Sequence, residues 1–202
     1  MAKVNIIIIN YNNFKDTIEC LESVLRLKYY SYQVILVDNN SENDSFSILQ
    51  NWARQRGSFV SYYFDGTKYV EREKCVLLEK DSSGGVELSC YPIIFIQTHD
   101  NLGFSGGNNV GIQFSLDYGE PEYFWFLNND TVIDNEALSA LVKTSNSDKN
   151  IGVVGSKILY YDLPKKIQCL GGYDIKYGYA QSRYDGRQDF GVGDFEVKGY
   201  IN

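Results

Sequence analysis

Asparagine and aspartate side chains gather in four short clusters, each at or just beyond the end of an apolar run. The clusters are Asn10-Tyr11-Asn12, Asp38-Asn39-Asn40, Asp100-Asn101-Leu102-Gly103 and Asn128-Asn129-Asp130. Amide and carboxylate oxygens accept hydrogen bonds from sugars and bases, and they also suit hard cations. One polar cluster at the end of a strand means little, but four of them predict a site that holds a polar ligand.

The last cluster has the chemistry of a cation site. Asn128 and Asp130 place two oxygen-bearing side chains two residues apart. Such oxygens suit Mg²⁺ or Mn²⁺ that also bonds phosphate oxygens, and we predict Asp130 as the metal ligand. The tripeptide alone equally allows a turn or helix cap.

A glycine-rich segment at residues 101–109 opens a predicted helix. Exposed backbone amides and the helix dipole can meet phosphate or ribose there, which points to Asn101, Gly103, Gly106, Gly107 and Asn108 as ligand-binding residues. The G-K-[ST] element of a P-loop is absent, and a purely structural turn is the alternative.

Two other side chains can meet a nucleotide. Asp38 can accept hydrogen bonds from a base or ribose, and Tyr11 can stack on a base or donate a hydrogen bond. A turn role for Asp38 and a packing role for Tyr11 remain open. His99 has no second histidine or cysteine near it in the sequence, which argues against a metal site there.

Apolar patterns typical of buried strands alternate along the chain with patterns typical of helices, and this order predicts an α/β fold with a mostly parallel sheet. The expected strands are residues 4–9, 33–37, 93–96, 123–127 and 153–160, and the expected helices begin near residues 14, 46, 106 and 136. Ligands of open α/β sheets bind beyond the carboxyl ends of the strands, so the four clusters should share one edge.

The stretch at residues 59–98 changes to Tyr, Val and Ile with Lys and Glu interruptions. The turn signal at residues 81–85 predicts an inserted β-hairpin within about residues 60–92. A disulfide between Cys75 and Cys90 across it is the less favoured alternative to reduced thiols. Beyond Cys169 we expect irregular antiparallel strands.

Length and composition bound the remaining choices. The 202 residues, 44% of them hydrophobic, suit a single domain over 1–202, and no apolar run approaches the roughly 20 residues of a transmembrane helix. Without a signal-peptide profile, we expect a cytoplasmic protein. The net charge of −7 disfavours non-specific binding to nucleic acid. It also implies that a bound diphosphate needs a cation or well-placed amides beside it.

Four motifs in order resemble family 2 glycosyltransferases, notably the rhamnosyltransferase-like branch. They are Ile-Ile-Ile-Asn-Tyr-Asn at 7–12, Val-Asp-Asn-Asn-Ser at 37–41, Asn-Leu-Gly-Phe-Ser-Gly-Gly-Asn-Asn at 101–109 and Phe-Leu-Asn-Asn-Asp-Thr at 126–131. The resemblance spans about residues 4–161. It implies a GT-A fold, a Rossmann-like three-layer sandwich, with a UDP- or dTDP-sugar donor, a Mg²⁺ or Mn²⁺ ion and inversion at the anomeric carbon.

The resemblance also implies roles for individual residues. Asn10, Tyr11, Asn12 and Asp38 would hold the nucleotide base, and the segment at residues 100–108 would line the nucleotide and sugar. The triplet Asn128-Asn129-Asp130 corresponds to the D-x-D element, in which Asp130 would hold the metal and Asn128 is at most a weak neutral ligand. Asn128 and Asn129 would also contact the donor.

The resemblance places the catalytic base further along, after residues 199–202, so we expect it beyond Asn202 and expect a C-terminally truncated domain with little transfer activity of its own. By analogy the acceptor is a glycan or lipid-linked glycan, with peripheral association at the inner face of a membrane. A non-catalytic nucleotide- or glycan-binding module and a sugar-nucleotide pyrophosphorylase are the alternatives. The sequence carries no signal for the oligomeric state.

Overall fold

The computed structural model describes residues 1–56, 59–75, 78–80, 86–88, 93–170, 173–176, 179–182 and 186–189. The chain divides into two compact units, Met1–Asn135 and Glu136–Asn202. All four polar clusters lie in the first unit, which therefore contains the whole candidate site.

The first unit is built on a six-stranded sheet with the order β4-β3-β7-β2-β1-β8. Its strands are β1 (Val4–Asn10), β2 (Tyr32–Asp38), β3 (Phe59–Phe64), β4 (Tyr69–Cys75), β7 (Ile93–Thr98) and β8 (Tyr123–Asn128). All neighbouring pairs are parallel except β3 with β4, which confirms the predicted mostly parallel sheet. The four predicted strands in this sheet all extend one or two residues further than their apolar runs, into or towards the polar clusters.

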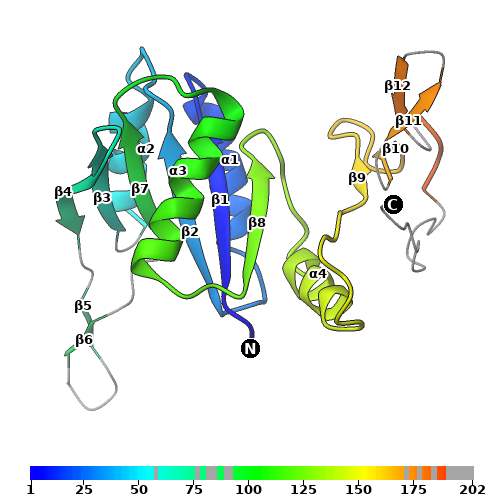
Figure 1. The fold of residues 1–202 in the computed structure, drawn as a ribbon, viewed down its shortest axis with the longest axis horizontal. Helices are drawn as coiled ribbons and strands as arrows, with labels where there is room; N and C mark the ends of the chain where they lie inside the picture. The colour runs from blue at the N-terminus through cyan, green and yellow to red at the C-terminus, as the bar shows by residue number, and fades with distance from the viewer. Residues whose placement is uncertain are drawn as a thin grey trace. The chain divides into compact units, whose positions relative to one another are not determined.

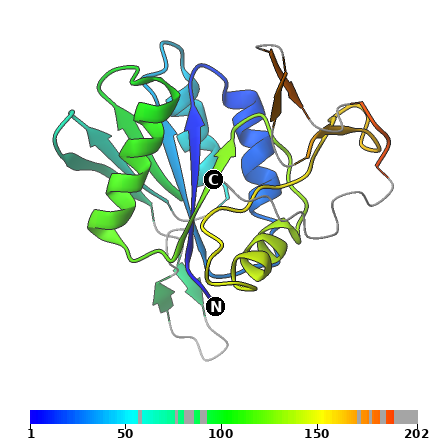
Figure 2. The same ribbon diagram turned by 45° about the vertical axis from the view of Figure 1, so that its right-hand side comes forward.

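Helices cover both faces of the sheet (Figure 1 and Figure 2). The chain steps in one direction from β1 to β2 and on to β3 through α1 (Phe14–Val24) and α2 (Ser45–Arg54). It steps in the opposite direction from β7 to β8 through α3 (Gly103–Tyr118). Because such crossovers are right-handed, α1 and α2 cover one face and α3 the other, which makes the predicted three-layer sandwich.

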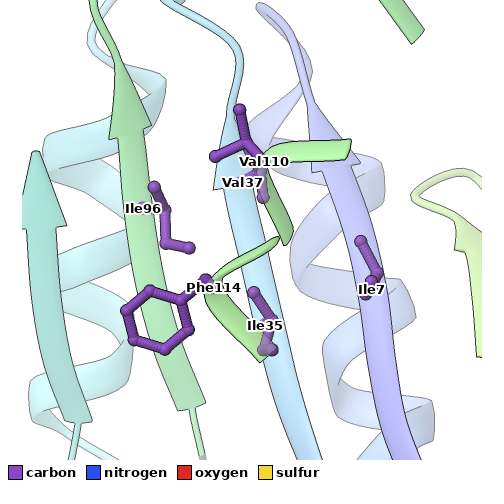
Figure 3. Packing of buried hydrophobic residues seen from close by; sticks show 6 residues of the cluster. All are labelled: Ile7, Ile35, Val37, Ile96, Val110 and Phe114. Atoms are coloured by element: carbon purple, nitrogen blue, oxygen red, sulfur yellow. The ribbon is translucent and has the colours of Figure 1, made fainter. Parts of the chain in front are cut away.

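Apolar side chains from the central strands and α3 form the core on the α3 face (Figure 3). Ile7, Ile35, Val37 and Ile96 from β1, β2 and β7 meet residues of α3. This packing explains why β1 and β2 read as nearly continuous apolar runs, since both of their faces are covered.

Two glycines let α3 lie close to the sheet. A Cβ atom at Gly111 would lie 2.8 Å from Cγ2 of Ile7, whereas one at Gly107 would lie 3.3 Å from side-chain carbons of Ile9. The helix begins at Gly103, three residues before the predicted start at residue 106. Gly103 has φ +67°, a left-handed conformation that lets the chain turn into the helix directly after the β7 loop.

The region at residues 60–92 contains two antiparallel pairings. β3 pairs with β4, and the short strands β5 (Leu78–Lys80) and β6 (Val86–Leu88) pair with each other, as predicted for an inserted hairpin. The predicted turn at residues 81–85 and Cys90 lie outside the described residues. The Tyr69 hydroxyl of β4 donates to the backbone oxygen of Val110 at 2.8 Å and so ties this strand to α3.

The second unit contains α4 (Ala137–Ser145), as predicted, followed by β9 (Ile158–Leu159), β10 (Ile167–Cys169), β11 (Tyr173–Lys176) and β12 (Tyr179–Ser182). The expected strand at residues 153–160 is wrong except for the two residues of β9. Gly152 and Gly155 weaken this stretch, and Val153 is 81% exposed, so its apolar residues find no sheet to cover them. None of the helices in the described part of the chain is long and apolar enough to cross a membrane.

One cysteine of α1 lies beneath the end of β8. The Cys20 thiol is free and fully buried, and its Sγ donates to the backbone oxygen of Asn128 at 3.6 Å. Burial raises the pKa of Cys20 from 9.0 to about 12, with a backbone hydrogen bond from Thr131 acting against the rise and the Asp130 carboxylate acting in the same direction as burial. The thiol is thus a protonated packing group under the last polar cluster.

We predict that Gly111→Ala lowers the free energy of unfolding, although alanine favours helix. Overpacking costs about 1–3 kcal/mol, which exceeds a gain in helix propensity of about 1 kcal/mol. Gly107→Ala is the matched control, because it carries the same propensity gain with a looser contact. Equal changes for both variants in urea unfolding would contradict the close approach of α3 to Ile7.

The Cys20 thiol should make stability depend on alkaline pH. Because its pKa is raised in the folded state, stability is full below pH 9 and falls as the pH rises towards 12, where the unfolded chain loses the proton first. The test is urea unfolding of the wild type and of Cys20→Ser at pH values from 8 to 10, because the loss of stability should begin at about pH 9. The variant should lose less stability with rising pH, and parallel curves would exclude the buried thiol as the cause.

Candidate functional site

The four polar clusters meet at one edge of the sheet, as predicted. Asn10 pairs with Asp38 across β1 and β2, and Ile9 pairs with Asn128 across β1 and β8. Asp38 in turn pairs with Gln97 of β7, so the loop that carries Asn101 follows at the same edge. Parallel pairing in this register brings together residues that are far apart in the sequence.

The topological switch point of the sheet lies between the neighbouring strands β2 and β7, because the connections that follow these two strands run in opposite directions across the sheet. The loop after β2 leads to α2 on one face, and the loop after β7 leads to α3 on the other. Ligands of open α/β sheets bind at such switch points. The structure therefore places the second and third clusters at the position where a ligand is expected on topological grounds.

Asn39 joins the two loops at the switch point. Its Nδ2 donates to Oδ1 of Asn101 at 2.9 Å and to the backbone oxygen of Gly103 at 3.1 Å. Its Oδ1 accepts the backbone N–H of Leu102 at 3.0 Å. Asn39 is buried and was not among the predicted ligand-binding residues, because nothing in the sequence indicates that its side chain turns towards β7.

A buried carboxylate organises the loops after β1 and β2. Asp38 is 1% exposed, and its Oδ2 accepts hydrogen bonds from Asn10 Nδ2 and the Ser41 hydroxyl, both at 2.7 Å. The backbone N–H of Ser41 donates to its Oδ1 at 3.0 Å. Asn40 adopts φ 60°, a left-handed conformation that asparagine tolerates, and this turn lets Ser41 fold back onto Asp38.

Asn12 continues this network towards the surface. Its backbone N–H donates to the Ser41 hydroxyl at 2.9 Å, and its Oδ1 accepts the backbone N–H of Glu42 at 2.8 Å. The Tyr11 hydroxyl donates to the Glu42 carboxylate at 3.3 Å. Tyr11 and Asn12 are exposed, so they form the rim above the buried Asp38.

Thr17 of α1 links the first cluster to the last. Its hydroxyl lies 2.9 Å from Oδ1 of Asn10, to which it can donate, and it accepts a hydrogen bond from Nδ2 of Asn129 at 2.8 Å. Sequence reasoning missed Thr17. Its position between Phe14 and Leu21 was an available signal, since a polar side chain there stands on the apolar face of the helix.

The glycine-rich segment divides into exposed and enclosed residues. Asn101 and Gly103 are exposed, whereas Gly107 and Asn108 are buried and Asn108 Nδ2 donates to the backbone oxygen of Phe104 at 2.9 Å. A Cβ at Gly106 would lie 2.6 Å from Cβ of its neighbour Leu102, so glycine is needed there for packing. Leu102 stands at the N-cap of α3 and makes no side-chain cap bond.

His99 lies on the side of the β3–β4 hairpin. Its exposed ring lies 6.3 Å from the ring of Phe64, and a Cβ at Gly66 would lie 3.0 Å from its Cε1. These contacts place His99 against the β3–β4 hairpin.

The two predicted metal ligands lie at the surface. Asn128 and Asp130 are exposed, and within the described ranges the Asp130 carboxylate has no hydrogen-bond partner. The described part of the chain contains no group of three or more His, Cys, Asp and Glu side chains that could hold a metal. One carboxylate and one amide oxygen suit an ion that takes its other ligands from phosphate and water, as Mg²⁺ does.

Comparison with known proteins agrees with this architecture. Residues 5–74 match the model of the family described as Glycosyl transferase family 2. The chain is 34% identical over 86 residues to the low-salt glycan biosynthesis hexosyltransferase Agl10 of Haloferax volcanii. That match covers 42% of this chain and 28% of the relative, so the chain corresponds to a minor part of that protein.

Two solved structures are similar to this chain. The mannosyltransferase PcManGT from Pyrobaculum calidifontis, in complex with GDP-Man and Mn²⁺, gives a TM-score of 0.53 at 15% identity, over 79% of this chain and 36% of that one. S. aureus TarS 1-349 gives a TM-score of 0.48 at 18% identity, over 78% of this chain and 39% of that one. The family model thus matches residues 5–74, and the likeness to PcManGT is one of fold.

Proposed function

We propose that the polar edge of the sheet binds a nucleoside-diphosphate sugar, and that the protein transfers the sugar to an acceptor hydroxyl. One observation carries the proposal: a continuous hydrogen-bonded network joins the ends of β1, β2 and β8 and meets the β7 loop at the switch point. The match to glycosyl transferase family 2 begins at the first of these strands and includes the second.

In this proposal the nucleoside lies over the loops after β1 and β2. Tyr11 and Asn12 are exposed there, so their side chains can meet a base or ribose directly. Asn10 and Asp38 are enclosed beneath them and support this surface through the bonds to Ser41. A direct contact of Asp38 with the base would require the Ser41 hydroxyl to move.

The diphosphate lies between the start of α3 and Asp130. The helix dipole of α3 favours negative charge at its first turn, and exposed Asn101 adds an amide beside it. Uncharged asparagines dominate the edge, which limits repulsion of a diphosphate by a protein of charge −7. Asp130, with Asn128, would hold a Mg²⁺ or Mn²⁺ ion, which would supply positive charge to the leaving diphosphate.

In the transfer, the bond between the anomeric carbon and the diphosphate oxygen breaks, and the acceptor oxygen bonds that carbon from the opposite face with inversion. The acceptor proton passes to a base, to which we assign no residue of this chain. Following the sequence resemblance, the donor is a UDP- or dTDP-sugar with a hexosyl or rhamnosyl group, and the acceptor is a glycan or lipid-linked glycan at the inner face of a membrane. PcManGT was solved with GDP-Man and Mn²⁺, so GDP belongs in the same test.

The metal role of Asp130 predicts a metal-dependent affinity. UDP, dTDP and GDP are titrated by calorimetry with and without Mn²⁺, and the best of them should bind more tightly with the ion. Asp130→Asn should remove most of that gain, about tenfold or more, since it replaces a charged contact by a neutral one. Asp117→Asn, the same change near the far end of α3, should leave the gain intact. Equal affinities of the wild type with and without Mn²⁺ would count against the metal site.

The supporting role of Asp38 predicts a different loss. Asp38→Asn weakens the bonds that fold Ser41 back under Asn12, so nucleotide affinity should fall about tenfold both with and without Mn²⁺. Asp44→Asn, a few residues further along the same loop, is the control. Unchanged affinity of the Asp38 variant, measured on protein with an unaltered circular dichroism spectrum, would remove Asp38 from the site.

A further inference from the structure

The Thr17 hydroxyl stands between the nucleoside side and the metal side of the proposed site. We propose that Thr17 is a positioning residue that couples nucleoside binding to metal binding, through one chain of hydrogen bonds. The inference rests on the proposed function, and it assigns to α1 a part in donor binding that the sequence motifs do not contain.

This series of hydrogen bonds links residues of four elements. Asn129 Nδ2, after β8, donates to Oγ1 of Thr17 at 2.8 Å. The Thr17 hydroxyl donates to Oδ1 of Asn10 at the end of β1, at 2.9 Å. Asn10 Nδ2 donates to Oδ2 of Asp38 at the end of β2, at 2.7 Å. The first and last of these links join residues 112 and 28 positions apart, so they depend on the tertiary structure.

The turn after β8 is held by its middle residue. Asn129 is half-buried and bonded to Thr17, whereas Asn128 and Asp130 on either side are exposed. With Asn129 fixed from below, its neighbours are directed outward. The bond to Thr17 therefore sets where the Asp130 carboxylate is presented to an ion.

The Thr17 hydroxyl has two alternative acceptors. Besides Asn10, the backbone oxygen of Asn13 lies 2.7 Å from Oγ1, the bond that threonine commonly makes to the residue four positions earlier in a helix. A hydroxyl has one proton, so donation to Asn13 leaves Oδ1 of Asn10 without this donor. A nucleoside that fixes the loops after Asn10 and Asp38 favours donation from Thr17 to Asn10. In that state the hydrogen bonds run without a break from Asp38 to Asn129.

The coupling is measured as the ratio of nucleotide dissociation constants without and with Mn²⁺, for UDP, dTDP and GDP. Thr17→Val keeps the shape of the side chain and removes the hydroxyl, and we expect it to lower the ratio about tenfold, the size of one lost buried hydrogen bond. Thr17→Ser keeps the hydroxyl and should retain the ratio. By linkage, the gain in Mn²⁺ affinity that nucleotide produces should fall by the same factor in Thr17→Val.

A matched control separates coupling from a general loss of stability. Ser23 is also a buried α1 hydroxyl, which donates to the backbone oxygen of Cys20 at 2.7 Å and accepts the N–H of Ile133 at 3.1 Å. Ser23→Ala should lower the melting temperature as Thr17→Val does and leave the ratio unchanged. Asn129→Ala breaks the same link from a less buried position, and it serves if Thr17→Val does not fold.

The outcomes distinguish the two hypotheses. If the wild type binds none of the three nucleotides, the proposed function fails and the coupling fails with it. If the wild type shows a metal-dependent gain that both Thr17→Val and Asn129→Ala retain, the site stands and the coupling is wrong. An equal loss in Thr17→Ser would also overturn it, because the hydroxyl would then not be the operative group.

Discussion

The buried hydrogen bond between Asn10 and Asp38 is the constraint on which the polar edge depends. A carboxylate enclosed at a sheet edge is tolerated only when its oxygens are satisfied, and Asp38 achieves this with Asn10 and both donors of Ser41. That requirement forces the chain after β2 to turn back through the left-handed Asn40. The bond also requires β1 and β2 to keep their register, since a slip by one residue would move Asn10 away from Asp38.

Asparagine suits this edge because each amide offers a donor and an acceptor without charge. The side chains of Asn10 and Asn129 bond to Thr17 of α1, and that of Asn39 bonds to the loop after β7, which are contacts that strand pairing does not supply. A carboxylate at these positions would lose the donor, and it would add negative charge where we propose that a diphosphate binds. The rigid part of the edge is therefore neutral, apart from the enclosed Asp38.

Local pattern was a sound guide to the strands and helices of the first unit. β-branched runs gave the strands because both faces of the central sheet are covered, and helical spacing identified α2 from Phe46, Leu49 and Trp52. The start of α3 was misplaced by three residues, because the bond from Leu102 to Asn39 and the left-handed Gly103 arise from tertiary contact. The strand at residues 153–160 was overextended because an apolar run indicates a strand only where another strand pairs with it.

The amino-acid sequence by itself determined the order of elements and the polar clusters at the strand ends, because both are written in short-range periodicity and residue type. The tertiary structure alone decided which of those side chains support the edge and which face outward. Asn10, Asp38 and Asn39 are enclosed, whereas Tyr11, Asn12 and Asp130 are exposed, although all six belong to the clusters at the strand ends. The physical reason is that enclosure follows from strand register and from pairs such as Thr17 with Asn129 and Asn39 with Asn101, which lie 112 and 62 positions apart along the chain, beyond the span of any local pattern.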